Sequence, residues 1–146
     1  MKRSRPRRTL EQVKLYQAAL DAALAVGKLF QHHPAHEEQT GLTTDVLRAT
    51  RKVCAGIAAG WTVRQNIELS LAHLEEAQGH AAEAMVLLEI AHRLGYLKAN
   101  QVQPQVQTYQ QFIQRISQLA ESRQELGFMG GGCGEGGCGH CHDEEE

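Results

Sequence analysis

The sequence lacks several features that would place it in common protein classes. No run of roughly 18 apolar residues occurs, so no membrane-spanning helix is predicted. The basic N-terminus is not followed by the apolar stretch of a secretory signal, which favours a cytoplasmic protein. The motifs G-x-S-x-G and H-E-x-x-H are missing, as is a glycine loop that opens a helix to bind phosphate. We therefore expect a protein that is not an enzyme.

Aromatic residues make up only 5% of the chain and prolines number three, whereas Ala, Leu, Gln and Glu dominate its middle. That composition favours helices, and 146 residues suffice for one domain with one core. Apolar periodicity and stop signals predict an all-α protein, an antiparallel up-down-up-down four-helix bundle. The predicted helices start after Thr9, between His36 and Thr43, near Val63 and near Gln101.

Thr9 and Gln12 fit a capping box at the start of the first helix. That helix has two apolar stripes, which predicts burial on more than one side. The stripes are Val13, Leu20, Leu24 and Gly27, and Leu15, Ala19, Ala22, Val26 and Leu29. In the last helix, Phe112, Leu119 and Leu126 lie off the main stripe of Val102, Val106, Tyr109, Ile113 and Ile116. We expect those three to face another subunit.

Charge divides the chain into three parts: a basic disordered arm (1–9), the bundle (10–126) and a disordered, glycine-rich tail with Cys, His and acids (127–146). The arm is either a solvated terminus or a nucleic-acid contact, because basic arms commonly bind phosphates. The candidate nucleic-acid-binding residues come from the arm and the second helix. They are Lys2, Arg3, Arg5, Arg7, Arg8, Arg48, Arg51 and Lys52.

Three segments of the sequence resemble a known family. Gly41-Leu42-Thr43-Thr44-Asp45-Val46-Leu47-Arg48-Ala49, followed by Ile57-Ala58-Ala59-Gly60, is similar to the central motif of the four-helix-bundle proteins encoded by intervening sequences in bacterial 23S ribosomal RNA genes. Ala77-Gln78-Gly79 and the stretch from Leu87 to Tyr96 resemble the family's third helix. The motif departs at Gly56 and Ala59, where the family has Asn and Glu, while Arg48 matches it. It also departs where the family has Gln, Arg and Pro, at Asp45, Leu47 and Cys54.

The resemblance implies a homopentamer around a central channel. The family also includes the accessory variability determinant of diversity-generating retroelements, which binds a reverse transcriptase and nucleic acid. The leading hypothesis is therefore a non-enzymatic, homo-oligomeric adaptor that binds RNA, a reverse transcriptase, or both.

The tail supports an alternative hypothesis of another class, a metal-binding or metal-responsive oligomer. Thiolates and imidazoles are preferred zinc ligands, and C-x2-C is a common zinc spacing. The candidate ligands are Cys133, Cys138, His140, Cys141 and His142. An inert tail and redox chemistry between the thiols are further alternatives. Without an export signal, structural disulfides are not expected.

The third predicted helix carries His73, Glu76, His80 and Glu83 on one face. Metal sites in bundles use such residues, but they draw ligands from several facing helices, and the other predicted helices offer few. We therefore interpret this face as solvated, with Glu–His pairs between neighbouring turns.

Overall fold

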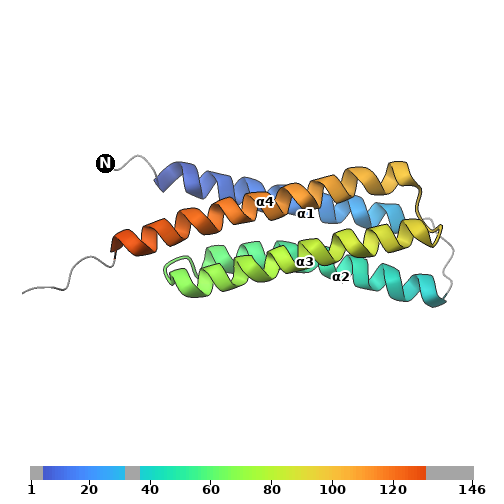
Figure 1. Ribbon diagram of the computed structural model, residues 1–146, viewed down its shortest axis with the longest axis horizontal. Coiled ribbons are helices and arrows are strands. Elements are labelled where there is room, and N and C mark those ends of the chain that lie inside the picture. Colours follow the sequence, from blue (N-terminus) through green and yellow to red (C-terminus); the bar gives the residue numbers. More distant parts are fainter. Residues whose placement is uncertain (1–4, 32–36, 131–146) are drawn as a thin grey trace, which may run out of the picture.

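The computed structural model describes residues 5–31 and 37–130, which form four helices (Figure 1). They are α1 (Arg5–Phe30), α2 (Glu37–Thr62), α3 (Ile67–Arg93) and α4 (Ala99–Gly130). The described residues contain no strand. The all-α prediction is confirmed.

Successive helices run antiparallel beside one another and form a bundle (Figure 1). The packed pairs are α1 with α2, α2 with α3, α3 with α4, and α4 with α1, so α1 and α3 lie diagonally opposite. One end of the bundle gathers the start of α1, the connection between α2 and α3, and the end of α4. This arrangement confirms the predicted four-helix bundle and brings residues from all four helices together at that end.

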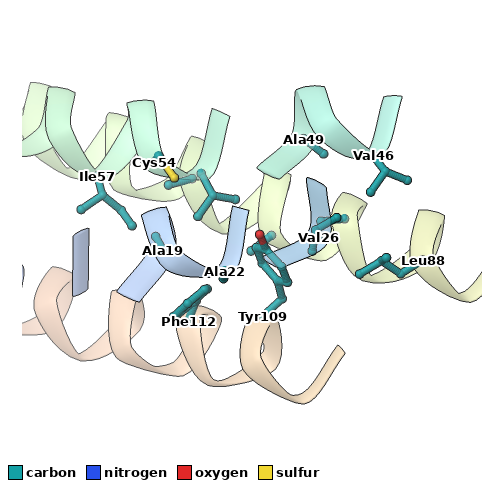
Figure 2. Close-up of a cluster of buried hydrophobic side chains, with 14 of the residues drawn as sticks. Ala19, Ala22, Val26, Val46, Ala49, Cys54, Ile57, Leu88, Tyr109 and Phe112 are labelled. Carbon is teal, nitrogen blue, oxygen red and sulfur yellow. The ribbon is translucent and has the colours of Figure 1, made fainter. Parts of the chain in front are cut away.

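The core consists of one stripe from each helix (Figure 2). Of the two stripes predicted for α1, Leu15, Ala19, Ala22 and Val26 are buried. Tyr109 and Phe112 of α4 meet edge to face, with ring centroids 5.3 Å apart. Small side chains fill much of α3, where Ala77, Ala81, Ala84 and Ala91 are all buried. The core therefore depends on close helix packing as much as on large side chains.

Phe112 corrects one prediction, because it is 2% exposed and belongs to the core rather than to an inter-subunit surface. It lies three residues after Tyr109 and four before Ile116, which places all three on one side of α4. The buried stripe of α4 is wider than predicted, since α4 packs against both α3 and α1. Leu126 is 49% exposed, as an outward-facing residue requires.

The first helix begins earlier than predicted. It starts at Arg5, so Thr9 lies inside α1 rather than at its N-cap, and residues 5–9 are helical rather than disordered. Pro6 explains the earlier start, because proline is favoured in the first turn, where its missing N–H has no helical partner. At the other end, α4 extends to Gly130, past the predicted end at Leu126.

The third helix begins at Ile67, four residues later than predicted, because Asn66 caps it. The Asn66 side chain accepts a hydrogen bond from the Leu69 N–H at 3.1 Å. The predicted stop is confirmed: Gly95 has a φ of 82°, in the left-handed region that favours glycine. The Tyr96 N–H then donates to the Ala91 carbonyl at 2.9 Å.

The second and third helices approach most closely at Gly56. A Cβ added there would lie 2.8 Å from Ala77 Cβ and 3.1 Å from the His73 carbonyl oxygen. Gly56 is one of the places where the central motif departs from the family pattern. In this chain the position has no room for a side chain unless α2 and α3 move apart.

Candidate nucleic-acid interface

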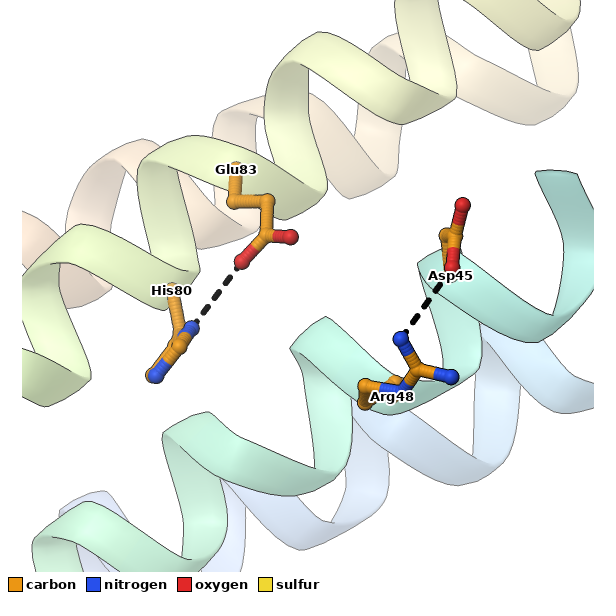
Figure 3. A network of polar contacts seen from close by, with 4 residues as sticks. All are labelled: Asp45, Arg48, His80 and Glu83. Carbon is orange, nitrogen blue, oxygen red and sulfur yellow. Dashed lines mark hydrogen bonds and ion pairs between the residues drawn. The ribbon is translucent and has the colours of Figure 1, made fainter.

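Three predicted nucleic-acid-binding cations, Arg48, Arg51 and Lys52, are exposed on α2. Their spacing of three and four residues places them on one side of the helix. Arg48 forms an ion pair with Asp45 at 3.4 Å (Figure 3), while Arg51 and Lys52 form none within the described chain. Two unpaired cations thus remain available to a ligand on this helix.

The neighbouring face of α3 holds two local pairs rather than a metal site. His80 Nδ1 lies 3.0 Å from a Glu83 carboxylate oxygen (Figure 3), and His73 Nδ1 lies 3.8 Å from Glu76. Each pair joins successive turns of one helix, as predicted. Across residues 5–31 and 37–130, no group of three or more potential ligands is placed to hold a metal ion.

A second polar cluster joins the helices at one end of the bundle. Arg123 of α4 donates to the Gly60 carbonyl at 3.0 Å and also to Gln12 Oε1. Gln12 is 2% exposed, and its Nε2 donates to the Ile57 carbonyl at 3.3 Å. Ser70 Oγ of α3 donates to the same Gly60 carbonyl at 2.7 Å. The carboxyl end of α2 is therefore capped by side chains from two other helices.

Beside this cluster, Arg64 stacks on Trp61. The Arg64 Cζ atom lies 4.3 Å from the centre of the Trp61 ring, and Nη1 donates to the Trp61 carbonyl at 3.1 Å. Burial lowers the pKa of Arg123, and the nearby charge of Arg64 lowers it further. The two guanidinium groups are therefore close enough to repel each other.

Sequence reasoning missed both groups at this end. Gln12 and Arg123 are 111 residues apart, so no local pattern links them. The spacing of Trp61 and Arg64 by three residues was the local signal for their contact, although Arg64 lies in the turn after α2 rather than in the helix.

Two exposed apolar faces lie on diagonally opposite helices. On α1, the large residues of the stripe that lies outside the core are exposed, and Tyr16 is exposed beside them. Its members are Val13, Tyr16, Leu20 and Leu24, called the α1 face below. On α3, Val86, Ile90 and Leu94 are exposed at intervals of four residues, and these form the α3 face. The outer side of α4, in contrast, exposes mainly glutamines.

Several predicted site residues lie outside what the structure describes. Lys2 and Arg3 precede its first residue, and the side chains of Arg5, Arg7 and Arg8 are not described, although their backbone is helical. The predicted zinc ligands of the tail are likewise outside the described residues. They are Cys133, Cys138, His140, Cys141 and His142.

The comparison of sequences agrees with the resemblance that the central motif carries. Residues 11–118 match the family described as 23S rRNA-intervening sequence protein, and this segment covers most of the 146 residues. The chain belongs to this family. The 23S rRNA-intervening sequence protein family is not a known enzyme family, and the match spans most of the bundle, from Glu11 of α1 to Gln118 of α4.

The match excludes the first turns of α1 and everything after Gln118, so the arm and the tail lie beyond it. Comparisons with curated proteins and with solved structures found no match. None of the four described helices has the length and apolar character needed to cross a membrane.

Proposed function

We propose that this protein is a homo-oligomeric adaptor, without catalytic activity, that binds RNA in the cytoplasm. Membership of the 23S rRNA-intervening sequence protein family carries the proposal, because the family name points to ribosomal RNA. Exposed cations on α2 and exposed apolar faces on α1 and α3 support it.

The two apolar faces support self-association. They differ from each other and lie on diagonally opposite helices, so the α1 face of one copy can pack on the α3 face of the next. Contacts between two different surfaces generate rings when the rotation between copies closes. A homopentamer, which the sequence resemblance implies, is such a ring. Burying these side chains between copies would remove apolar area from water.

The cations on α2 support binding to a polyanion. Arg51 and Lys52 are exposed and unpaired among the described residues, and ring formation repeats them in every copy. Several weak contacts to one RNA then combine by avidity. A retroelement reverse transcriptase, itself bound to nucleic acid, is the protein partner that we propose for the same assembly.

Fluorescence anisotropy with a labelled RNA fragment tests the RNA-binding proposal. The double variant Arg51→Gln/Lys52→Gln should bind more weakly and should reduce the slope of log affinity against log salt by up to about two. The control is Arg93→Gln/Lys98→Gln. It removes the same amount of positive charge from the carboxyl end of α3 and the connection to α4, away from the α2 cations. Equal affinity and equal slopes for wild type and the α2 variant would contradict a role for these cations.

The tail supports a second candidate function, a metal-binding oligomer. The spacing of Cys133, Cys138 and Cys141, with His140 and His142 between and beside them, matches the ligand preferences of zinc. In this alternative the bundle serves to bring several tails together.

A further inference from the structure

We propose that Trp61, Arg64 and Arg123 form a binding site for single-stranded RNA at the end of the bundle. In this site a base stacks on the Arg64–Trp61 pair, and the adjoining phosphates lie against the two guanidinium groups. This inference rests on the proposed RNA-binding function and assigns it to a particular surface.

The Trp61–Arg64 pair, on which the base would stack, is already formed in the structure. Arg64 lies over the Trp61 ring at 4.3 Å, and its hydrogen bond to the Trp61 carbonyl at 3.1 Å fixes it there. Arg64 is exposed, so the side of its guanidinium that faces away from the indole is open to a ligand. Unstacked RNA bases commonly stack on aromatic rings and on the planes of arginine guanidinium groups.

The charge of this end favours an anion. Burial lowers the pKa of Arg123, and the charge of Arg64 lowers it further because the two cations repel each other. Neither forms an ion pair with a described residue, although Glu68, Glu121 and Glu125 lie on the adjoining segments. The carboxyl end of α2 offsets part of the Arg123 charge through its dipole. A phosphate between the two guanidinium groups would relieve the remaining repulsion.

The site is also preorganised. Gln12 Oε1 and the Gly60 carbonyl, from α1 and α2, both accept hydrogen bonds from Arg123 and hold it in place. A guanidinium carries five N–H donors, so further donors remain for a ligand. Because the side chain is already ordered, binding costs less conformational entropy than it would with a free surface arginine.

The position of the site fits the rest of the molecule. The start of α1, which contains Arg5, Arg7 and Arg8, lies at the same end of the bundle (Figure 1). The α1 and α3 faces run along the sides of the bundle, so an assembly built through them leaves its ends free. A strand of RNA can then pass from one copy to the next. Stacking needs an unpaired base, which favours single strands over duplex RNA.

Trp61 is the only tryptophan in the chain, so its fluorescence reports directly on this site. The test is a titration of the full-length protein with oligouridylate, followed by tryptophan emission and by anisotropy of a labelled copy. We expect quenched Trp61 emission at saturation and only weak competition by duplex RNA. Arg64→Gln should weaken binding roughly five-fold or more and lower the salt slope by about one. Lys98→Gln makes an equal change of charge at the other end of the bundle. It should change affinity by less than about two-fold, because salt screens a charge that lies far from the site.

Arg64→Gln leaves the Gln12–Arg123–Gly60 contacts in place and is therefore expected to fold, which the helical circular dichroism signal verifies. Binding of oligouridylate with unchanged Trp61 emission, or with equal affinity for Arg64→Gln and wild type, would overturn this site while leaving RNA binding intact. Failure of the wild-type protein to bind any RNA would overturn both the site and the proposed function.

Discussion

Arg123 caps the carboxyl end of α2 by donating a hydrogen bond to the Gly60 carbonyl at 3.0 Å, across 63 residues of sequence. Ser70 donates to the same oxygen at 2.7 Å, so one carbonyl joins α2, α3 and α4. The last carbonyls of a helix have no partner within it, and a cation beside them also interacts favourably with the helix dipole. This contact therefore stabilises the end of the bundle at which all four helices meet.

Arg123→Met should lower the free energy of unfolding by about 1–3 kcal/mol, because it removes charge-assisted hydrogen bonds to Gly60 and to the buried Gln12. Urea denaturation at fixed protein concentration measures this change. Arg51→Met, at an exposed position without an ion pair among the described residues, should change it by less than about 0.5 kcal/mol. Similar losses in the two variants would show that the cap has no special role.

Gly56→Ala should destabilise the bundle by about 1–3 kcal/mol, since the new Cβ would lie 2.8 Å from Ala77 Cβ on the facing helix. Gly79 offers a matched control inside α3, because a Cβ added there meets nothing within 4 Å. Gly79→Ala should increase stability by about 0.5–1 kcal/mol, through the better helix propensity of alanine. Thermal melting should therefore show a lower melting temperature for Gly56→Ala and a higher one for Gly79→Ala than for wild type. A shift in the same direction for both variants would contradict the close packing at Gly56.

The burial of the Tyr109 side chain predicts that the protein loses stability at alkaline pH. Its hydroxyl is buried without a hydrogen-bond partner of good geometry, while the nearby Thr50 hydroxyl donates to the Leu47 carbonyl at 2.9 Å. Burial raises the pKa of Tyr109 above its ordinary value of 10.0, and Cys54 adds to the shift. The folded state therefore keeps a proton that the unfolded chain releases. This contribution is complete below pH 10.0 and decreases as the pH rises above it.

Tyr109→Phe should flatten the decline in unfolding free energy above about pH 10, and should not lower stability near neutrality. Urea denaturation at several pH values measures both effects. Tyr16→Phe, at an exposed tyrosine of α1, should follow the wild-type curve. A decline as steep in Tyr109→Phe as in wild type would assign the alkaline transition to other groups. Cys54, whose pKa burial raises from an ordinary value of 9.0, is the next candidate.

Periodicity predicted the core well where each helix has a clear apolar stripe. Val46, Ala49, Val53 and Ile57 of α2 are all buried, as their spacing indicates. The same argument failed for Phe112, because periodicity alone does not reveal that α4 contacts two neighbours. It also gave two stripes for α1 without identifying the buried one. That choice depends on how α1 is rotated against α2 and α4, which is a tertiary property.

Local signals were accurate where one residue decides the structure and inaccurate where two signals compete. Gly95 ends α3 as predicted, since its positive φ suits glycine. At the start of α1, the capping pattern at Thr9 competes with Pro6, and the helix begins at Arg5. The contacts of Arg123 were beyond prediction, because they join side chains that only the assembled bundle brings together.

The tail prediction separates the two candidate functions. Tag-free protein prepared under reducing conditions should contain about one zinc per chain if Cys133, Cys138 and Cys141 bind metal with a tail histidine. Affinity should fall with decreasing pH, because the thiols must lose protons to bind. Changing these three cysteines to serine should abolish the metal and leave the helical signal intact. Zinc content that does not respond to those substitutions would remove the metal-binding alternative.

The central claim, a homo-oligomer that binds RNA, is tested most directly by size-exclusion chromatography with light scattering, with and without added RNA. We expect a particle of several times the 16.1 kDa chain mass, five times for a pentamer, that carries RNA in the same peak. Leu20→Glu/Leu24→Glu, which places charges on the α1 face, should reduce the mass toward one chain, whereas Gln114→Glu on α4 should not. A wild-type peak of 16.1 kDa that elutes apart from the RNA would contradict the account.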